Sequence, residues 1–190
     1  MKLVFATHNQ NKFTEVKVML PHHLELLSLD DIGCDEEIPE TADTIEGNAI
    51  LKANYVRDNY NLDCFADDTG LEVKSLNNEP GVYSARYAGE AHNAEANIQK
   101  LLKNLDGKED RSARFKTAIA LSMNHSKIMF LGICEGEIIK EPRGESGFGY
   151  DPIFQPEGFN TTFAEMTLIQ KSEIGHRGKA MGQLIDYLSK

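Results

Sequence analysis

The feature that most constrains the fold is a long stretch in which apolar and polar residues alternate. From Ala113 to Met123 every second residue except Thr117 is apolar, and the apolar run Ile128 to Ile133 follows after Asn124-His125-Ser126. A spacing of two is that of a half-buried strand, and a short polar segment between two such runs predicts an antiparallel hairpin. We therefore expect a sheet with at least one antiparallel pair of strands.

The rest of the chain alternates between short strands and helices. Apolar runs predict strands over 3–6, 23–29 and 64–66, and helical spacing predicts helices over 13–20, 45–60, 98–105 and 176–188. Asp43 is expected to cap the 45–60 helix, and Gly107 to end the 98–105 helix. The glycine-rich segment 142–156 is expected to form a loop that carries a short strand. Strand–helix units combined with a hairpin indicate an α/β protein with a mixed sheet.

Length and charge narrow the class of protein. With 190 residues the chain suits one domain over 1–190, or two small lobes that share a core. Its net charge of −10 opposes binding to a nucleic acid backbone or an anionic membrane. No stretch approaches the ~20 apolar residues of a membrane span, and the first apolar run is too short for a signal peptide, so we expect a cytoplasmic protein. The cysteines are widely spaced, which favours reduced thiols over disulfides or a zinc site.

A polar loop joins the first strand to the first helix. It consists of Thr7, His8, Asn9, Gln10, Asn11 and Lys12. The N–H groups of a helix N-terminus attract anions, and Lys12 adds a positive charge in the first turn, so this loop can hold a phosphate. It lacks the glycines of a Walker loop or a dinucleotide-binding fingerprint. The alternative is a polar turn with a solvated lysine.

Two adjacent acids, Asp67 and Asp68, directly follow the apolar strand 64–66. Neighbouring residues of a strand face opposite ways, so we expect only one of them to point into a given cleft, while the other has a structural role. Mg²⁺ needs one or two protein carboxylates in addition to substrate oxygens, and Glu40, in the acidic loop 30–43, is the candidate second ligand. The alternative is an aspartate that caps a turn before Gly70.

A third group of residues suits a flat heterocycle. Gly147-Phe148-Gly149-Tyr150-Asp151-Pro152 combines glycines that allow close approach, aromatic rings for stacking and a carboxylate for a purine edge. Farther along, four basic residues gather in an acidic chain, which indicates a small, highly charged anion; they are Lys171, His176, Arg177 and Lys179. The alternatives are an aromatic turn before a strand and a helix start with solvated basic side chains.

Together and in this order, these segments resemble the inosine triphosphate pyrophosphatases, or Ham1-like proteins. The similar segments are Thr7-His8-Asn9-Gln10-Asn11-Lys12, Pro39-Glu40-Thr41 with Glu46-Gly47-Asn48-Ala49, Phe65-Ala66-Asp67-Asp68-Thr69-Gly70-Leu71, Pro80-Gly81-Val82-Tyr83-Ser84-Ala85-Arg86, Gly147-Phe148-Gly149-Tyr150-Asp151-Pro152 and His176-Arg177-Gly178-Lys179-Ala180. The resemblance runs nearly end to end. Ser172 and Gly175 depart from it, because the family more often has Asn and Ser there.

The resemblance implies an elongated, two-lobed α/β fold around a central mixed β-sheet, with a nucleotide cleft between the lobes and a homodimer as the assembly. The implied reaction is hydrolysis of ITP, dITP and XTP to the nucleoside monophosphate and pyrophosphate, which clears deaminated purines from the nucleotide pool. Asp68 would be the catalytic acid–base residue and, with Glu40, a Mg²⁺ ligand.

The same resemblance assigns the residues that hold the substrate. The phosphates would be bound by Thr7, Asn9, Lys12, Thr69 and Lys171, with His8, Gln10 and Asn11 as further substrate-binding residues of the first loop. The base would be surrounded by Phe148, Gly149, Tyr150, Asp151, His176 and Arg177.

Three alternatives lead to different functions. A pyrophosphatase of pyrimidine triphosphates, like the Maf-related enzymes, is disfavoured by the purine-pocket residues that the resemblance implies. A regulatory protein that binds a nucleotide without catalysis would not need Glu40 and Asp68, and both are present. A nucleic-acid-binding module is disfavoured by the net charge of −10 and by the lack of a basic helix or an aromatic-rich sheet motif.

Overall fold

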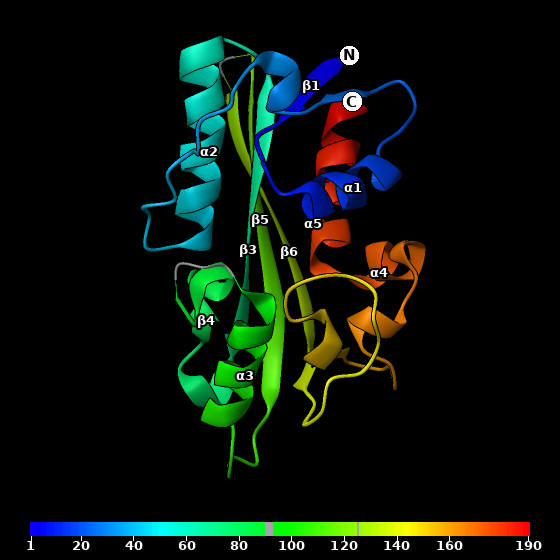
Figure 1. Ribbon diagram of the computed structural model, residues 1–190. Coiled ribbons are helices and arrows are strands. Elements are labelled where there is room, and N and C mark those ends of the chain that lie inside the picture. The colour runs from blue at the N-terminus through cyan, green and yellow to red at the C-terminus, as the bar shows by residue number, and fades with distance from the viewer. Residues whose placement is uncertain (90–92, 125) are drawn as a thin grey trace. The chain divides into compact units, whose positions relative to one another are not determined.

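The computed structural model describes residues 1–89, 93–124 and 126–190, and it confirms the α/β class with a mixed sheet (Figure 1). The strands in this part of the chain are β1 (Lys2–Phe5), β2 (Glu25–Leu27), β3 (Cys64–Val73), β4 (Glu79–Gly81), β5 (Ser112–Met123), β6 (Ser126–Ile138) and β7 (Phe154–Pro156). The helices are α1 (Gln10–Met19), α2 (Ile45–Tyr60), α3 (Ala94–Asn104), α4 (Leu168–Ile174) and α5 (His176–Leu188). None of the helices described is long and apolar enough to cross a membrane.

The strands form one sheet in the order β2-β1-β3-β5-β6-β7, with β4 paired to β3. β1 runs parallel to β2 and β3, whereas β4 is antiparallel to β3 and β7 is antiparallel to β6. The chain forms two compact units. Unit 1 consists of Met1–Asp68, Thr117–Gly132 and Arg177–Lys190, and unit 2 of Thr69–Lys116 and Ile133–His176. Strands β3, β5 and β6 therefore contribute residues to both units.

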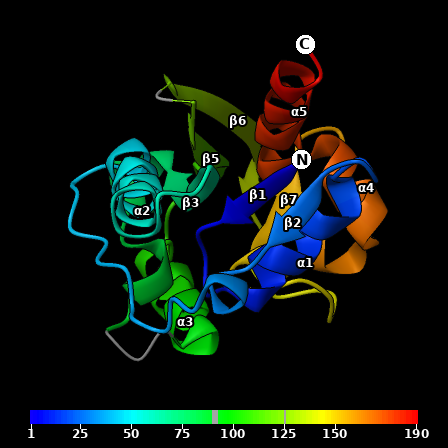
Figure 2. The ribbon, with the colours of Figure 1, turned by 90° about the horizontal axis from the view of Figure 1, so that it is seen from above.

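In unit 1, helices cover both faces of the sheet. α2 lies on one face, and α1 and α5 lie on the other (Figures 1 and 2). The face under α1 and α5 packs around the stacked rings of Phe5 and Phe65, whose centroids are 4.6 Å apart. On the opposite face, the Cys64 thiol donates a hydrogen bond to the Ala53 carbonyl at 3.2 Å, which ties α2 to β3. The start of α1 and the side of α2 are thus both fixed relative to β3.

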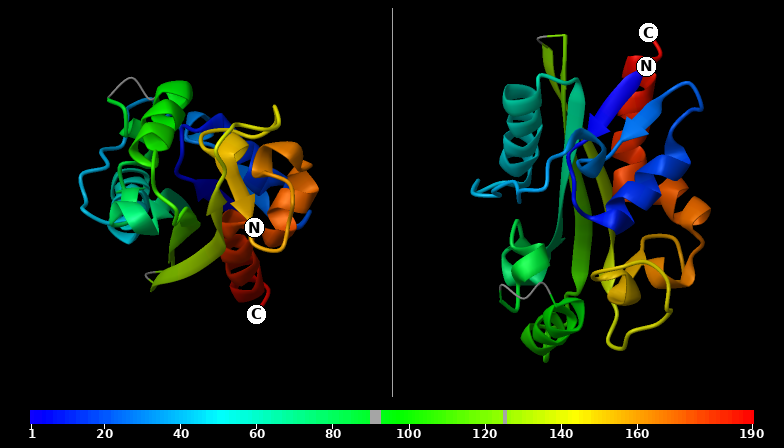
Figure 3. Two further views of the ribbon diagram at one scale, coloured as in Figure 1. Left: turned by 90° about the horizontal axis from the view of Figure 1, so that it is seen from below. Right: turned by 45° about the horizontal axis from the view of Figure 1, so that its top comes forward.

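Unit 2 has a separate core. The rings of Phe115, Phe154 and Phe163 meet with centroids 4.7 to 5.9 Å apart. Figure 3 shows α3, in green, on one side of this part of the sheet and α4, in orange, on the other. α3 adds the buried residues Ile98 and Leu101 to the same cluster. The glycine-rich segment 142–156 and α4 are therefore parts of unit 2.

Most of the predicted elements are confirmed. β5 and β6 are neighbours in the sheet, although His125 of the expected turn lies outside the described residues. The predicted helices correspond to α1, α2, α3 and α5, with α5 starting at His176, and β7 is the expected short strand. The strand predicted over 23–29 is shorter, at Glu25–Leu27. α4 was not predicted, because its 7 residues are too few to give a periodic pattern.

Two predicted helix boundaries are wrong. α2 is capped by Thr44 in place of Asp43, since the Thr44 hydroxyl accepts a hydrogen bond from the Gly47 N–H at 3.0 Å. α3 ends at Asn104, with Leu105 as its C-cap, and so stops before Gly107. In both cases a neighbouring residue already satisfies the backbone groups that a helix end leaves unpaired.

The prediction that Asp67 and Asp68 stand at the end of a strand is also wrong. β3 continues through them to Val73, so both acids lie in the middle of the strand, and no aspartate caps a turn before Gly70. Aspartate and glycine are poor strand formers, which is why the sequence pattern stops at residue 66. The strand persists because each carboxylate has cationic partners from other segments.

Gly47, in the first turn of α2, packs against the segment that precedes the helix. A Cβ at this position would lie 2.6 Å from the Ala42 Cβ and 2.9 Å from the Thr44 Oγ1. We expect Gly47→Ala to destabilise the protein by about 1–3 kcal/mol, because overpacking outweighs the gain in helix propensity. Urea unfolding measures the change.

The matched control is Gly182→Ala in α5, where nothing lies within 4 Å of an added Cβ. This substitution should stabilise the protein by up to about 1 kcal/mol, because only the helix propensity changes. Equal effects of the two substitutions would contradict the packing argument for Gly47.

Candidate functional site

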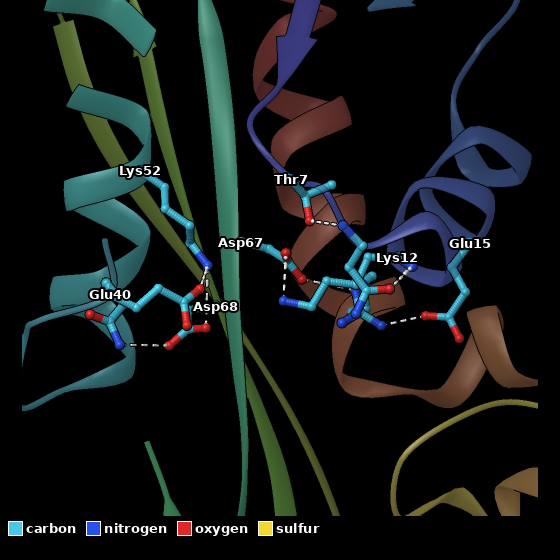
Figure 4. A network of polar contacts seen from close by, with 10 residues as sticks. Thr7, Lys12, Glu15, Glu40, Lys52, Asp67 and Asp68 are labelled. Atoms are coloured by element: carbon cyan, nitrogen blue, oxygen red, sulfur yellow. Dashed lines mark hydrogen bonds and ion pairs between the residues drawn. The ribbon is translucent and has the colours of Figure 1, made fainter. Parts of the chain in front are cut away.

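The two acids of β3 point to opposite sides of the strand. Figure 4 shows Asp68 with Glu40 and Lys52 on one side, and Asp67 with Lys12 on the other. Both carboxylates are buried, with exposed fractions of 0% for Asp67 and 6% for Asp68. The expected alternation of neighbouring strand residues is thereby confirmed, and it gives the two acids separate surroundings.

On the side of Asp68, one lysine faces two carboxylates. The Lys52 Nζ lies 2.5 Å from the Glu40 Oε1 and 3.4 Å from the Asp68 Oδ1. Asn48, one turn earlier in α2, donates from Nδ2 to the Asp68 Oδ2 at 3.4 Å. The structure thus brings together Glu40 and Asp68, the two predicted metal ligands, around a positive charge supplied by α2.

Burial and charge act against each other in this group. Burial raises the pKa of the Asp68 carboxyl above its ordinary value, and this outweighs the lowering by Lys52 and Lys12. Burial would lower the pKa of Lys52, but the carboxylates of Asp68 and Glu40 raise it above the usual value, so the lysine stays charged. The site therefore holds a buried cation next to a carboxylate that is more basic than an exposed aspartate.

On the opposite side, Asp67 is part of a buried chain of ion pairs. The Lys12 Nζ lies 3.0 Å from its Oδ1, and the Arg177 Nε lies 3.0 Å from its Oδ2. Arg177 also donates from Nη1 to the Glu15 carboxylate, which is buried on α1. These ion pairs connect α1, β3 and α5 of unit 1.

Burial and these ion pairs shift the pKa values of Asp67 and Lys12. Burial alone would raise the pKa of Asp67, but Lys12, Arg177 and Lys52 together hold it well below its usual range. Burial lowers the pKa of Lys12, and this outweighs the raising effect of Asp67. Asp67 is therefore a permanent anion whose role is to neutralise cations beside the site.

The polar loop 7–12 is folded as a helix cap. The Thr7 Oγ1 accepts a hydrogen bond from the Asn9 N–H at 3.1 Å, and the Asn9 Oδ1 accepts one from the Lys12 N–H at 3.1 Å. His8 contacts the Glu36 carbonyl through Nε2 at 3.0 Å. Gln10 and Asn11 form the exposed first turn of α1. The loop thus presents a helix N-terminus with Lys12 in its first turn, the arrangement that suits an anion.

The residues predicted to surround a base belong to unit 2, except Arg177. The Asp151 Oδ2 accepts hydrogen bonds from the Phe148 N–H at 2.9 Å and from the Lys171 Nζ at 2.5 Å. The Lys171 Nζ also lies 4.9 Å from the centroid of the Phe148 ring. Unit 2 thus brings three of the predicted residues together, with Asp151 and Lys171 buried and Phe148 half-buried.

The other predicted residues of unit 2 are held by different neighbours. Tyr150 donates its hydroxyl to the Ser84 carbonyl at 2.8 Å, and the His176 ring stacks on Phe115 with centroids 4.5 Å apart. Gly149 has a φ of +60°, a conformation that favours glycine. Thr69 is half-buried on β3, directly after Asp68.

The chemistry of Glu40 and Asp68 fits a divalent cation. Two carboxylates from different segments face one positive charge, and oxygen is the ligand that Mg²⁺ prefers. Within residues 1–89, 93–124 and 126–190, no three His, Cys, Asp or Glu side chains group as a metal site. A pair of carboxylates is enough for Mg²⁺ that is also bound by substrate phosphates. Glu40 and Asp68 are thus the residues that would hold the ion.

The sequence pattern assigned no role to Asn48, which stands in one of the similar segments, and did not single out Lys52 or Glu15. Asn48 and Lys52 are four residues apart on α2 and are buried, with exposed fractions of 0% and 6%. The available signal was the position of this polar pair next to the apolar stripe of α2, at the border between the buried and exposed faces of an amphipathic helix. Glu15 gave no signal, because one acid on a charged helix looks like a solvated residue.

Comparisons with known proteins extend over the whole chain. Residues 3–187 match the model of the Ham1 family. The sequence is 63% identical to the dITP/XTP pyrophosphatase of Christiangramia forsetii over 190 residues, which cover 100% of both chains. It is 61% identical to that of Flavobacterium johnsoniae over 189 residues, 100% of this chain and 98% of the relative. The Ham1 protein of Staphylococcus aureus has a similar fold, with a TM-score of 0.90 and 41% identity over 100% of this chain and 98% of that one.

The ion pairs of Asp67 make it a strong stability determinant. Asp67→Asn would leave the charges of Lys12 and Arg177 buried with one carboxylate fewer, so we expect a loss of about 3–5 kcal/mol in the free energy of unfolding. As a control, Glu25→Gln removes an exposed pair with Lys2 and should have no measurable effect. Urea unfolding of both variants checks this, and similar stability of the two would show that the buried network is not stabilising.

Proposed function

Because the chain belongs to the Ham1 family, we propose that it hydrolyses dITP, ITP and XTP to the nucleoside monophosphate and pyrophosphate. The relatives in Christiangramia forsetii and Flavobacterium johnsoniae carry the name dITP/XTP pyrophosphatase and match this chain over its full length. The reaction removes deaminated purine nucleotides from the pool of precursors for nucleic acid synthesis.

The position of Lys52 between Glu40 and Asp68 carries the proposal. Hydrolysis of a triphosphate requires positive charge against the phosphates and a carboxylate that takes a proton from water. Unit 1 supplies both, since the Lys52 Nζ lies 2.5 Å from Glu40 and 3.4 Å from a buried Asp68. A regulatory protein that only binds nucleotides would have no use for a buried Asp68 and a half-buried Glu40 that face the same lysine.

The residues of unit 1 act on the triphosphate. Asp68 accepts the proton of the water that attacks the α-phosphorus, and Lys52 stabilises the charge that develops on the phosphate oxygens. Lys12 and the N–H groups at the start of α1 bind the other phosphates. Glu40 and Asp68 would hold Mg²⁺, which would supply positive charge against the phosphates.

The residues of unit 2 bind the base. Phe148 offers an aromatic face, and Asp151 is held in place by Lys171 and the Phe148 N–H. A keto oxygen at the purine 6-position accepts hydrogen bonds from donors such as His176 and Arg177, whereas an amino group there leaves such donors unpaired. The cost of buried, unpaired donors is large enough to reject adenine. The base contact of Arg177 stays a prediction, because in this structure its guanidinium binds Asp67 and Glu15.

Two further properties complete the proposal. The resemblance to the inosine triphosphate pyrophosphatases supports a homodimer as the working assembly. The net charge of −10 opposes binding to a nucleic acid backbone, which supports free nucleotides over a polymer as the substrate, and we expect an enzyme of the nucleotide pool to act in the cytoplasm.

Pyrophosphate release with Mg²⁺ from dITP, ITP, XTP, ATP, GTP, CTP and UTP tests the function. We expect fast release from the first three, with the nucleoside monophosphate as the second product, and slow release from ATP and GTP. Activity centred on CTP or UTP would instead favour a Maf-like pyrimidine enzyme. Tight nucleotide binding without any product would favour a regulatory protein.

Asp68→Asn tests the assignment of the proton acceptor. The variant keeps the shape of the side chain but removes its basicity, so we expect kcat to fall by about 10³-fold or more with little change in the unfolding curve. Asp63→Asn is the control, because Asp63 immediately precedes β3 and pairs with Arg57 outside the site. A kcat near the wild-type value for Asp68→Asn would remove Asp68 from the mechanism.

A further inference from the structure

Asn48 is a fully buried amide that connects two parts of the candidate site. Its Oδ1 accepts a hydrogen bond from the Ala42 N–H at 2.9 Å, and its Nδ2 donates to the Asp68 Oδ2 at 3.4 Å. The exposed fraction of the residue is 0%. A buried amide with both ends engaged is expensive to rotate, because each end would then face a group of the wrong kind.

The orientation of this amide is set by the backbone. The Ala42 N–H is a donor and can only face the oxygen of the Asn48 side chain. The NH₂ group must therefore point toward Asp68, where it meets a carboxylate oxygen. A carboxylate that accepts from both Asn48 and Lys52, one on each oxygen, is fixed in rotation about its own axis.

The same amide restrains the segment that carries Glu40. Ala42 stands two residues after Glu40, ahead of the helix that Thr44 caps. Gly47 makes the close approach possible, since any Cβ there would lie 2.6 Å from the Ala42 Cβ. Lys52, one turn after Asn48, then meets Glu40 and Asp68 together. Both carboxylates are thus held from the first three turns of α2.

We infer that Asn48 is a positioning residue that holds the Glu40 segment and the Asp68 carboxylate in register, so that both carboxylates face one divalent cation. The inference rests on the proposed function in one respect: the cation is taken to be the Mg²⁺ of that reaction. Removal of a residue that orients metal ligands typically costs 10–100-fold in metal affinity. Without the amide, the Ala42 N–H loses its acceptor on α2 and the Asp68 Oδ2 loses a donor, while the contacts of Lys52 with Glu40 and Asp68 remain.

Titration of the full-length protein with Mn²⁺ alone, followed by the electron paramagnetic resonance of free Mn²⁺, tests this. We expect Asn48→Ala to raise the Kd for Mn²⁺ by about 10-fold or more. Asn48→Ser keeps a hydroxyl for one of the two contacts and should give an intermediate Kd, and it keeps the test usable if the alanine variant does not fold.

The chain offers a close structural control in Asn97. This residue occupies the same position in α3, four residues after the asparagine that caps the helix, and its exposed fraction is 4%. Its amide binds the Ala88 N–H at 2.6 Å and the Ala85 carbonyl at 3.0 Å, and within the described part of the chain it is not bonded to an acid. We expect both Asn97→Ala and Asn48→Ala to lower the melting temperature, because each removes buried hydrogen bonds. For Asn97→Ala the Kd for Mn²⁺ should stay within about twofold of the wild-type value, because Asn97 is hydrogen-bonded to neutral backbone groups rather than to a carboxylate.

Equal Kd values for wild type and Asn48→Ala, or the same rise in Kd for Asn97→Ala, would overturn the inference. Absence of Mn²⁺ binding by the wild-type protein would also overturn it. Pyrophosphate release by the wild-type protein is measured separately, so a failure of the proposed reaction is distinguished from a failure of the role of Asn48.

Discussion

The structure of unit 1 depends on the neutralisation of two buried carboxylates that are consecutive on one strand. Asp67 and Asp68 face opposite sides of β3, and each would be unstable in the interior without positive charge nearby. Lys12 and Arg177 reach Asp67 from α1 and α5, whereas Lys52 reaches Asp68 from α2. The placement of these helices against the sheet is thus an electrostatic requirement as well as a matter of apolar packing.

The two sides differ in their balance of charge. In the contacts described, Lys12 and Arg177 face Asp67 and Glu15, two cations with two anions. Lys52 faces both Glu40 and Asp68, one cation with two anions. The first side is balanced and suits a structural role. The second has an excess of negative charge in the described contacts, which is the condition under which an added divalent cation is stabilising.

The sequence predicts a mixed sheet with every strand except β4, four helices and the pairing of Glu40 with Asp68, because these leave local patterns or belong to ordered motifs. It does not predict that β3 runs through Asp67 and Asp68, since strand propensity at these residues is overridden by partners distant in the chain. Lys52 and Asn48 were missed for a related reason. A polar residue on a helix is normally solvated, and only the tertiary structure reveals that these two are buried.

The position of the two acids in the middle of a ten-residue strand also limits how the sequence can change in evolution. Side chains alternate along a strand, so inserting or deleting one residue before Asp67 would turn it toward α2 and Asp68 toward α1 and α5. The lysine of α2 would then face the acid that now neutralises Lys12. Insertions or deletions in this strand are therefore expected two residues at a time, whereas the loops at its ends can change in length by any number of residues.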